Sequence, residues 1–512
     1  MPIGRRATIG AGWVVAWRGV SRLLGVANTI ILARLLVPAD FGLVAMAITF
    51  ETSLLMMSAF PVQDALLRRT EAGTDLHNVA FTIQAVRALL TSLIIAAAAP
   101  IAADWFSEPR LTLLVLALAA TTAVNGLANI GMVEFQRELR FDVQFKLQLL
   151  PAMLQMLATL GTAWLTRSYW ALVVGLAVLR ISTVVLSYRF HPYRPRLSLS
   201  GWRLLVGFSF WLWLGCLAGM VWGQVDTFVV GPVFGSAGLG LYVLAGQVAS
   251  LPTTELIVPI STVLFAGFAY AQREGKTVAA NPLTIVSVLL LLLAPMALVI
   301  SAGAANLVAI LLGNKWSAAA PLVAIAAGQC LFEPFIQVAG AALVARGHVR
   351  GQFVVTALSA ALRAVFVTLA ALTGSLTMII VATSAALGSS AFLYAYPLQS
   401  DLKGELGRFL ASLARIALAS TAAGLMLIAL GFGWEPAKND LSWHVAPFVN
   451  LGLLTTIVAA TYTMTVLVLW FALGRPNGPE RIVLNLLQEF TPIRWLGGIH
   501  RRRTRTPPLY VP

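Results

Sequence analysis

Long apolar runs follow one another along almost the whole chain, separated by short polar turns. Runs of about 20 residues are long enough to cross the hydrocarbon core of a bilayer as helices. The pattern therefore predicts an all-α, polytopic membrane protein with about fourteen transmembrane helices. The predicted spans are 12–36, 39–66, 77–101, 111–132, 145–166, 168–188, 203–231, 237–270, 283–304, 317–345, 350–372, 376–396, 408–432 and 447–473.

The first half of this pattern returns in the second half. Residues 28–47 align without a gap on residues 226–245. The matched pairs are Thr29 with Thr227, Ala39 with Ala237, Gly42 with Gly240, Leu43 with Leu241, and Ala47 with Ala245. Weak symmetry between two hydrophobic halves is typical of transporters that rock one repeat against the other. The sequence thus predicts two pseudo-symmetric six-helix lobes, followed by two extra C-terminal helices.

The duplication also predicts the domain boundaries. An N-lobe covers residues 1–190 and a C-lobe covers 204–400, joined by a basic cytoplasmic linker at 191–203. Spans 13 and 14 occupy 401–474. The tail, 475–512, starts with an amphipathic segment and ends in a polybasic stretch. Its helix either lies on the inner leaflet or packs against protein. The apolar face holds Ile482, Val483, Leu486, Leu487 and Phe490.

Composition agrees with the membrane class. Hydrophobic residues make up 59% of the chain and charged residues 11%, whereas soluble domains carry roughly 25% charge. With the N-terminus inside, about 24 of the 35 Lys and Arg fall in cytoplasmic loops and tails. This predicts an N-in, C-in topology and explains the net charge of +15 without nucleic-acid binding. Cys216 and Cys330 lie in apolar spans, so no disulfide or metal site is expected.

Four segments carry a family resemblance: 31–47 (ILARLLVPADFGLVAMA), 135–141, 226–245 and 311–316. They resemble the Wzx-type polysaccharide flippases, most of all the colanic-acid and xanthan exporter branch. That superfamily also contains multidrug extruders and the lipid II flippase. The resemblance implies movement of undecaprenyl-pyrophosphate-linked oligosaccharide repeat units from the cytoplasmic to the periplasmic leaflet of the bacterial inner membrane, for exopolysaccharide or capsule synthesis. It also implies a polysaccharide polymerase and a chain-length regulator as partners, and no cofactor.

Arginines inside the spans are candidates for binding the pyrophosphate. The planar guanidinium fork matches phosphate oxygens and stays charged. A midspan charge costs at least about 2.5 to 3.5 kcal/mol, so several such positions are expected to have a function. Each either faces a cationic cleft between the lobes or forms a buried ion pair. The candidates are Arg18, Arg22, Arg87, Arg180 and Arg363. Arg34 and Arg415 lie near span ends and are expected to extend to the interface.

The intramembrane carboxylates form a second candidate set. One role is a coupling site that takes up Na⁺ or H⁺ in one state and pairs with an arginine in the other. The alternative is a fixed salt bridge, such as one with Arg363. For Asp226 the alternative is a hydrogen-bonding position at a helix end, because its repeat mate is Asn28. The candidates are Glu51, Asp226, Glu255 and Glu333, of which the last two lie beside helix-bending prolines.

Aromatic and glycine residues complete the expected site. Tryptophans on spans 1 and 7 either stack on sugar rings along a glycan path or serve as packing and belt anchors. They are Trp13, Trp17, Trp211 and Trp213, and Trp13 matches Trp211 in the repeat. Glycines at the short outer turns act as hinges or satisfy tight-turn geometry. They are Gly42, Gly235, Gly238 and Gly240.

Enzyme activity is not expected from this sequence. The longest outer loop, 433–446, holds Glu435, Asp440 and His444 without a convincing acid–base arrangement. No Walker motif is present in the sequence. The function predicted is therefore a flippase operating by alternating access. A lipid II flippase and a multidrug extruder of the same superfamily remain as alternatives.

Overall fold

The computed structural model describes most of the chain, and all regular structure in the described part is helical. The described residues are 19–21, 23–58, 66, 74–138, 140–200, 210–254, 282–396, 406–434, 446–476 and 478–490. Side chains are not described at 74, 141, 210–212, 345, 349, 446 and 485–490.

The first half of the described chain begins with helical residues 19–21 and 23–35 and continues through eight labelled elements. These are α2 (Pro38–Met57), α4 (Thr74–Ala97), α5 (Ala99–Trp105), α6 (Leu111–Asn125), η1 (Ile130–Met132), α7 (Val133–Arg137), α8 (Phe141–Thr166) and α9 (Trp170–Phe190).

The second half contains one 40-residue helix and a series of shorter ones, followed by three C-terminal helices. These are α11 (Phe210–Ala249), α13 (Pro282–Ala302), α14 (Ala304–Leu311), η3 (Asn314–Ala319), α15 (Ala320–Ala326), η4 (Ala327–Leu331), α16 (Glu333–Ala345), α17 (Val349–Ala371), α18 (Leu376–Ala395), α20 (Leu406–Ala429), α21 (Ala446–Ala472) and α22 (Pro479–Phe490).

Eleven helices of the described chain are long and apolar enough to cross a membrane. A twelfth span results if α6 and the bent segment Ile130–Arg137, which meet at 67°, are counted together. The expected all-α, multi-pass architecture is confirmed. The count of about fourteen spans stays a prediction, because two of the expected spans run into one another in α11 and the first begins outside the described residues.

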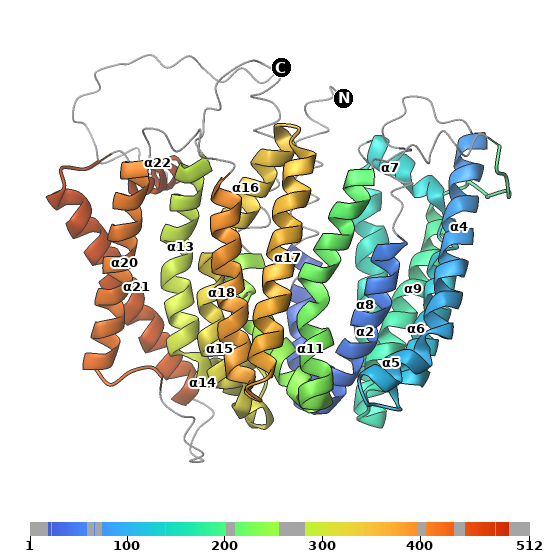
Figure 1. Ribbon diagram of the computed structural model, residues 1–512, viewed down its shortest axis with the longest axis horizontal. Coiled ribbons are helices and arrows are strands. Elements are labelled where there is room, and N and C mark those ends of the chain that lie inside the picture. The colour runs from blue at the N-terminus through green and yellow to red at the C-terminus, as the bar shows by residue number, and fades with distance from the viewer. Residues whose placement is uncertain are drawn as a thin grey trace.

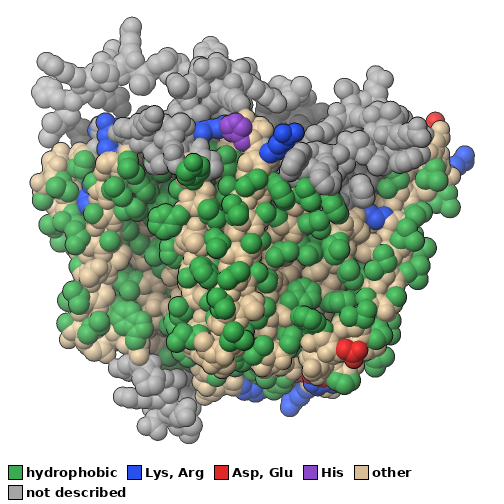
Figure 2. All heavy atoms as spheres, viewed as in Figure 1, with side chains coloured by type: hydrophobic (Ala, Val, Ile, Leu, Met, Phe, Trp, Pro, Cys, Tyr) green, Lys and Arg blue, Asp and Glu red, His purple; other side chains and the backbone are tan. Residues whose placement is uncertain are grey.

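Figure 1 shows how the halves are arranged. Helices α2 and α4–α9 gather on one side, α11–α18 on the other, and α20–α22 form the far edge beyond α13. We call the end of the bundle that carries α7 and α22 the α7 end, and the opposite end, with α5 and α14, the α5 end. Hydrophobic side chains cover the flank between these ends, while Lys and Arg gather toward the ends (Figure 2). This distribution fits a protein surrounded by lipid.

The sequence explains the sharpest local feature of the bundle, which is the break in α11. Pro232 lies inside this helix, and Gly235 has φ 67° and ψ −174°, a conformation that residues with a Cβ rarely adopt. The break divides α11 into a first segment, 210–234, and a second segment, 236–249. Gly235 thus has the geometry expected of a hinge or turn, whereas Gly42 lies inside the helix α2.

The linker that follows α9 is hydrogen-bonded to helices of the first half. Residues 191–199 have no regular structure, yet the Asn129 side chain donates to the backbone oxygen of Tyr193 at 2.9 Å. The Tyr193 hydroxyl in turn donates to the Asn78 side chain at 2.6 Å. Burial raises the pKa of this hydroxyl to about 12, so it stays protonated at neutral pH and keeps its hydrogen to donate.

The C-terminal helix α22 packs on the protein. The Arg415 Nε atom donates to Glu480 Oε1 at 2.7 Å, and both side chains are buried. Val483 contacts the apolar core formed by α13, α20 and α21. The expectation that Arg415 extends to the interface is therefore wrong, because Glu480 of α22 offers it a buried carboxylate.

Candidate functional site

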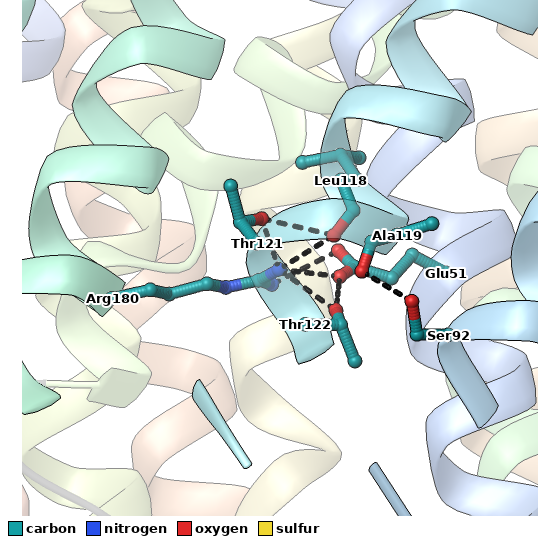
Figure 3. Close-up of polar contacts among 7 residues, drawn as sticks. All are labelled: Glu51, Ser92, Leu118, Ala119, Thr121, Thr122 and Arg180. Atoms are coloured by element: carbon teal, nitrogen blue, oxygen red, sulfur yellow. Dashed lines mark hydrogen bonds and ion pairs between the residues drawn. The ribbon is translucent and has the colours of Figure 1, made fainter. Parts of the chain in front are cut away.

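A buried ion pair joins α2 and α9 in the first half of the chain (Figure 3). Arg180 of α9 donates through Nη1 to Glu51 Oε1 at 2.6 Å and through Nη2 to Oε2 at 3.0 Å. The Glu51 side chain is 1% exposed and that of Arg180 is 18% exposed. This paired geometry is the strongest form of arginine–carboxylate contact.

Two adjacent threonines of α6 complete the coordination of this pair. Arg180 Nη1 lies 2.8 Å from the Thr121 hydroxyl and 2.9 Å from the Thr122 hydroxyl. Thr122 also donates to Glu51 Oε1. Helices α2, α6 and α9 are therefore tied together by a network in which each charge has several partners, as burial of charge requires.

We expect Thr122→Val to lower the free energy of unfolding by about 1.5–3 kcal/mol, because it removes hydrogen bonds to both members of a charged pair. Denaturant unfolding of the purified protein in detergent measures this. Ser92→Ala is the matched control, because the Ser92 hydroxyl donates to the Ala119 backbone oxygen at 2.7 Å, next to the pair without contacting it (Figure 3). The control is expected to cost about 0.5–1.5 kcal/mol. Equal losses of unfolding free energy in Thr122→Val and Ser92→Ala would show that Thr122 does not stabilise the ion pair.

The second half holds another buried ion pair, between α11 and α17. Arg363 donates through Nε to Asp226 Oδ1 at 3.0 Å and through Nη2 to Oδ2 at 2.5 Å. The guanidinium also lies over the Trp222 ring, with its carbon 4.7 Å from the ring centroid. Arg363 is thus held by a carboxylate and by an aromatic face, an arrangement suited to a desolvated guanidinium.

Tyr242 links this pair to the far side of the helix break. Its hydroxyl donates to Asp226 Oδ2 at 2.5 Å. Asp226 belongs to the first segment of α11 and Tyr242 to the second, so the carboxylate bridges the two segments across Gly235. Asp226 therefore contacts Arg363 of α17 and Tyr242 of the second segment at the same time.

Arg87 has a different environment from the two paired arginines. Its Nη1 donates to the Ser58 backbone oxygen at 3.2 Å, at the C-terminal end of α2, and its Nε is buried without a partner. A cation at a helix C-terminus is favourable, so a structural role for Arg87 is available. Among the described residues, no carboxylate lies within ion-pair distance of Arg87.

The remaining predicted residues are placed as follows. Glu333 is half-buried in the first turn of α16. The fixed salt bridge expected as an alternative for Arg363 forms with Asp226, whose two oxygens accept from Nε and Nη2. The indole nitrogen of Trp213 donates to the Met57 backbone oxygen at 3.1 Å, which joins α11 to the end of α2. Outside the described residues, or without a described side chain, are Arg18, Arg22, Glu255, Trp13, Trp17 and Trp211.

No group of three or more His, Cys, Asp and Glu that could hold a metal ion occurs in the part of the chain that the structure describes. The chemistry available at the two pairs is charge pairing and hydrogen bonding.

A family model described as "Polysaccharide biosynthesis protein" matches residues 31–321, which is more than half of the chain. The chain belongs to this polysaccharide biosynthesis family. The resemblance to polysaccharide flippases is thereby confirmed at the level of the family.

The curated proteins that this chain resembles are distant relatives. The chain is 24% identical over 326 residues to the succinoglycan biosynthesis transport protein ExoT of Rhizobium meliloti, covering 63% of this chain and 66% of that one. It is 20% identical to the teichuronic acid biosynthesis protein TuaB of Bacillus subtilis, covering 56% and 60%. It is 21% identical to the lipopolysaccharide biosynthesis protein WzxC of Escherichia coli, covering 68% and 72%. The matches thus span about two thirds or less of the first two relatives.

Two solved structures share the fold of this family member. The lipid II flippase MurJ in an inward closed conformation superposes with a TM-score of 0.67 and 11% identity, covering 88% of this chain and 99% of that one. An inward-facing multidrug resistance transporter of the MATE family superposes with a TM-score of 0.57 and 14% identity, covering 75% of this chain and 96% of that one. The chain therefore shares the all-α, multi-pass fold of these two transporters.

Sequence reasoning missed the residues that complete the two pairs. Thr121, Thr122 and Tyr242 are uncharged and were not singled out. Two adjacent hydroxyls inside the apolar run of α6 are the signal that could have found the threonines. Nothing local marks Tyr242, which contacts Asp226 only because α11 turns back at Gly235.

Proposed function

We propose that this protein is a flippase for undecaprenyl-pyrophosphate-linked oligosaccharide repeat units, which it moves from the cytoplasmic to the periplasmic leaflet for exopolysaccharide or capsule synthesis. The observation that carries the proposal is the packing of α20 and α21 against α13 in one continuous apolar core. A twelve-span drug extruder does not require these helices. Their presence is consistent with the larger share of this chain covered by the lipid II flippase fold than by the MATE fold.

The buried pairs support a mechanism of alternating access. Each pair ties together helices within one half, so the halves can move as rigid bodies against each other. The carboxylates of Glu51 and Asp226 are more deeply buried than their arginines, which are 18% and 15% exposed. A pyrophosphate that enters between the halves therefore reaches the guanidinium groups of Arg180 and Arg363 first, and can compete for them.

Arg87, Arg18 and Arg22 are proposed to supply the remaining positive charge along the path. A sugar-pyrophosphate headgroup cannot cross hydrocarbon without such groups in a wet cleft, whereas the prenyl tail remains in lipid. The tryptophans near the cleft would stack on the sugar rings. The substrate leaves chemically unchanged, so no catalytic residue or cofactor is needed.

The proposed setting is the bacterial inner membrane, with the α7 end in the cytoplasm and the α5 end in the periplasm. The relatives act in polysaccharide synthesis by name, which supports a polymerase and a chain-length regulator as partners at the periplasmic side. The repeat unit would pass to them after release.

Asp226 is the carboxylate best placed to couple transport to Na⁺ or H⁺, since it holds both Arg363 and Tyr242. We expect Asp226→Asn to reach the membrane at reduced abundance, because the amide keeps one acceptor oxygen but leaves Arg363 without its counter-charge. The molecules that insert should still move headgroups down their own gradient. They should lose the response of transport to an imposed Na⁺ or H⁺ gradient. Fluorescent headgroup translocation in proteoliposomes measures both rates, and a variant that responds to the gradient like the wild type would assign coupling to another residue.

Deletion of the gene in its native strain tests the proposed function. The expected result is loss of surface polysaccharide, with complete lipid-linked repeat units stranded on the inner leaflet. Truncated repeat units would indicate a glycosyltransferase, and repeat units accumulating on the outer leaflet would indicate a polymerase. Unchanged polysaccharide would overturn the proposal and leave lipid II or drug export as the function.

A further inference from the structure

The two halves of the chain touch backbone to backbone where α2 crosses the second segment of α11. A Cβ atom built on Gly42 would lie 1.7 Å from the backbone oxygen of Ser236. A Cβ atom built on Gly240 would lie 1.9 Å from the backbone oxygen of Pro38. Real Cβ contacts are never this short, so only glycine allows the two helices to approach so closely. We call Pro38, Gly42, Ser236 and Gly240 the seam.

The seam has the symmetry of the sequence repeat. In the gap-free alignment of 28–47 on 226–245, Pro38 matches Ser236 and Gly42 matches Gly240. Gly42 contacts Ser236 and Gly240 contacts Pro38, so exchanging the two repeats exchanges the two contacts. The seam therefore lies on the pseudo-twofold axis between the halves. Contacts on that axis form and separate together when one repeat rocks against the other.

Further contacts close the same end of the molecule. The buried Trp316 donates through its indole nitrogen to the Ala33 backbone oxygen at 2.8 Å. Trp105, the last residue of α5, donates in the same way to the Phe228 backbone oxygen at 3.2 Å. Both contacts join the first half to the second, and Trp105 places the junction at the α5 end. The structure thus represents a state in which the two halves are held together at the α5 end.

We propose that the glycine seam is the steric gate that closes the α5 end in one state of the transport cycle. This rests on the proposed function for its role, since a gate matters only to a protein that alternates. A Cβ at either glycine would meet a helix backbone, which cannot move aside as a flexible side chain can. Alanine at the seam therefore destabilises the closed state and shifts the population toward the state open at the α5 end.

A cysteine reporter tests the gate directly. Ser236, which is 9% exposed, is replaced by cysteine after Cys216 and Cys330 are changed to serine. A membrane-impermeant maleimide is then applied from the periplasmic side. We expect Gly42→Ala and Gly240→Ala to raise the labelling rate at least about tenfold. Gly246→Ala is the matched control on the same helix, because a Cβ there meets nothing within 4 Å, and it should label like the parent.

A second measurement covers the case in which the seam variants fail to accumulate. Pro38→Cys and Ser236→Cys are combined in the same cysteine-free background and treated with a short bifunctional maleimide. We expect crosslinking within the chain and arrest of export. Absence of crosslinking, or equal labelling of all three glycine variants, would overturn the gate. Crosslinking in a protein whose deletion leaves surface polysaccharide unchanged would instead keep the gate and reject the proposed cargo.

Discussion

Replacing Arg180 with glutamine is expected to abolish export and to lower the free energy of unfolding by about 3–5 kcal/mol. The loss of stability comes from Glu51, which stays in place after its arginine is removed. The Glu51 side chain is 1% exposed, so removal of the guanidinium leaves a buried carboxylate without a counter-charge. Surface polysaccharide of a complemented deletion strain measures export, and denaturant unfolding in detergent measures stability.

The double variant Glu51→Gln with Arg180→Gln separates the structural role of this pair from a role in transport. It removes both charges, so most of the lost stability should return, because no uncompensated charge stays buried. Export should remain absent if the guanidinium binds the substrate. Full export by the double variant would reduce the pair to a structural tie between helices. Undiminished stability of the single variant would contradict the burial seen in the structure.

Arg363→Lys is expected to reduce export at least about tenfold although the charge is retained, because an ammonium group cannot reproduce the planar fork. Lysine would lose the paired contacts to both oxygens of Asp226 and the stacking on Trp222. The measurement is export per molecule, with membrane abundance determined in parallel.

The control for this prediction is Arg189→Lys, at an exposed arginine in the last turn of α9. It makes the same chemical change without touching either pair and should leave export unchanged. Wild-type export by Arg363→Lys would show that only the charge at this position matters, and the forked contact would then have no role in transport.

For the arginines, the sequence predicted which residues matter but not which carboxylates they contact. Arg180 and Arg363 stood out because a charge within an apolar run of about 20 residues is costly. Their partners could not be assigned, since Glu51 lies 129 residues from Arg180 and Asp226 lies 137 residues from Arg363. The sequence therefore allowed both a cleft-facing role and an ion pair, without fixing the carboxylate that pairs with Arg363. The packing of α11 against α17 brings Asp226 to it.

The glycines are a second case in which the sequence indicated the residues but the packing of helices determined their role. Gly42 and Gly240 were matched by the repeat alignment, yet of the four glycines expected at turns or hinges only Gly235 has a positive φ. Gly42 and Gly240 are needed for close approach of two helices. That requirement depends on which two helices cross and at which residues they cross. The periodicity of a single segment does not predict either.

By itself, the sequence determined the membrane class, the all-α architecture, the internal duplication and the family resemblance. Each of these follows from local quantities, namely the length and hydropathy of runs, the spacing of charges and a recurring string of residues. Only the tertiary structure decided which charges neutralise each other, that α22 packs through Arg415 and Glu480, and that the repeats meet at a glycine seam. These features join residues far apart in the chain, and their energies depend on burial and distance between helices that exist only once the bundle is assembled.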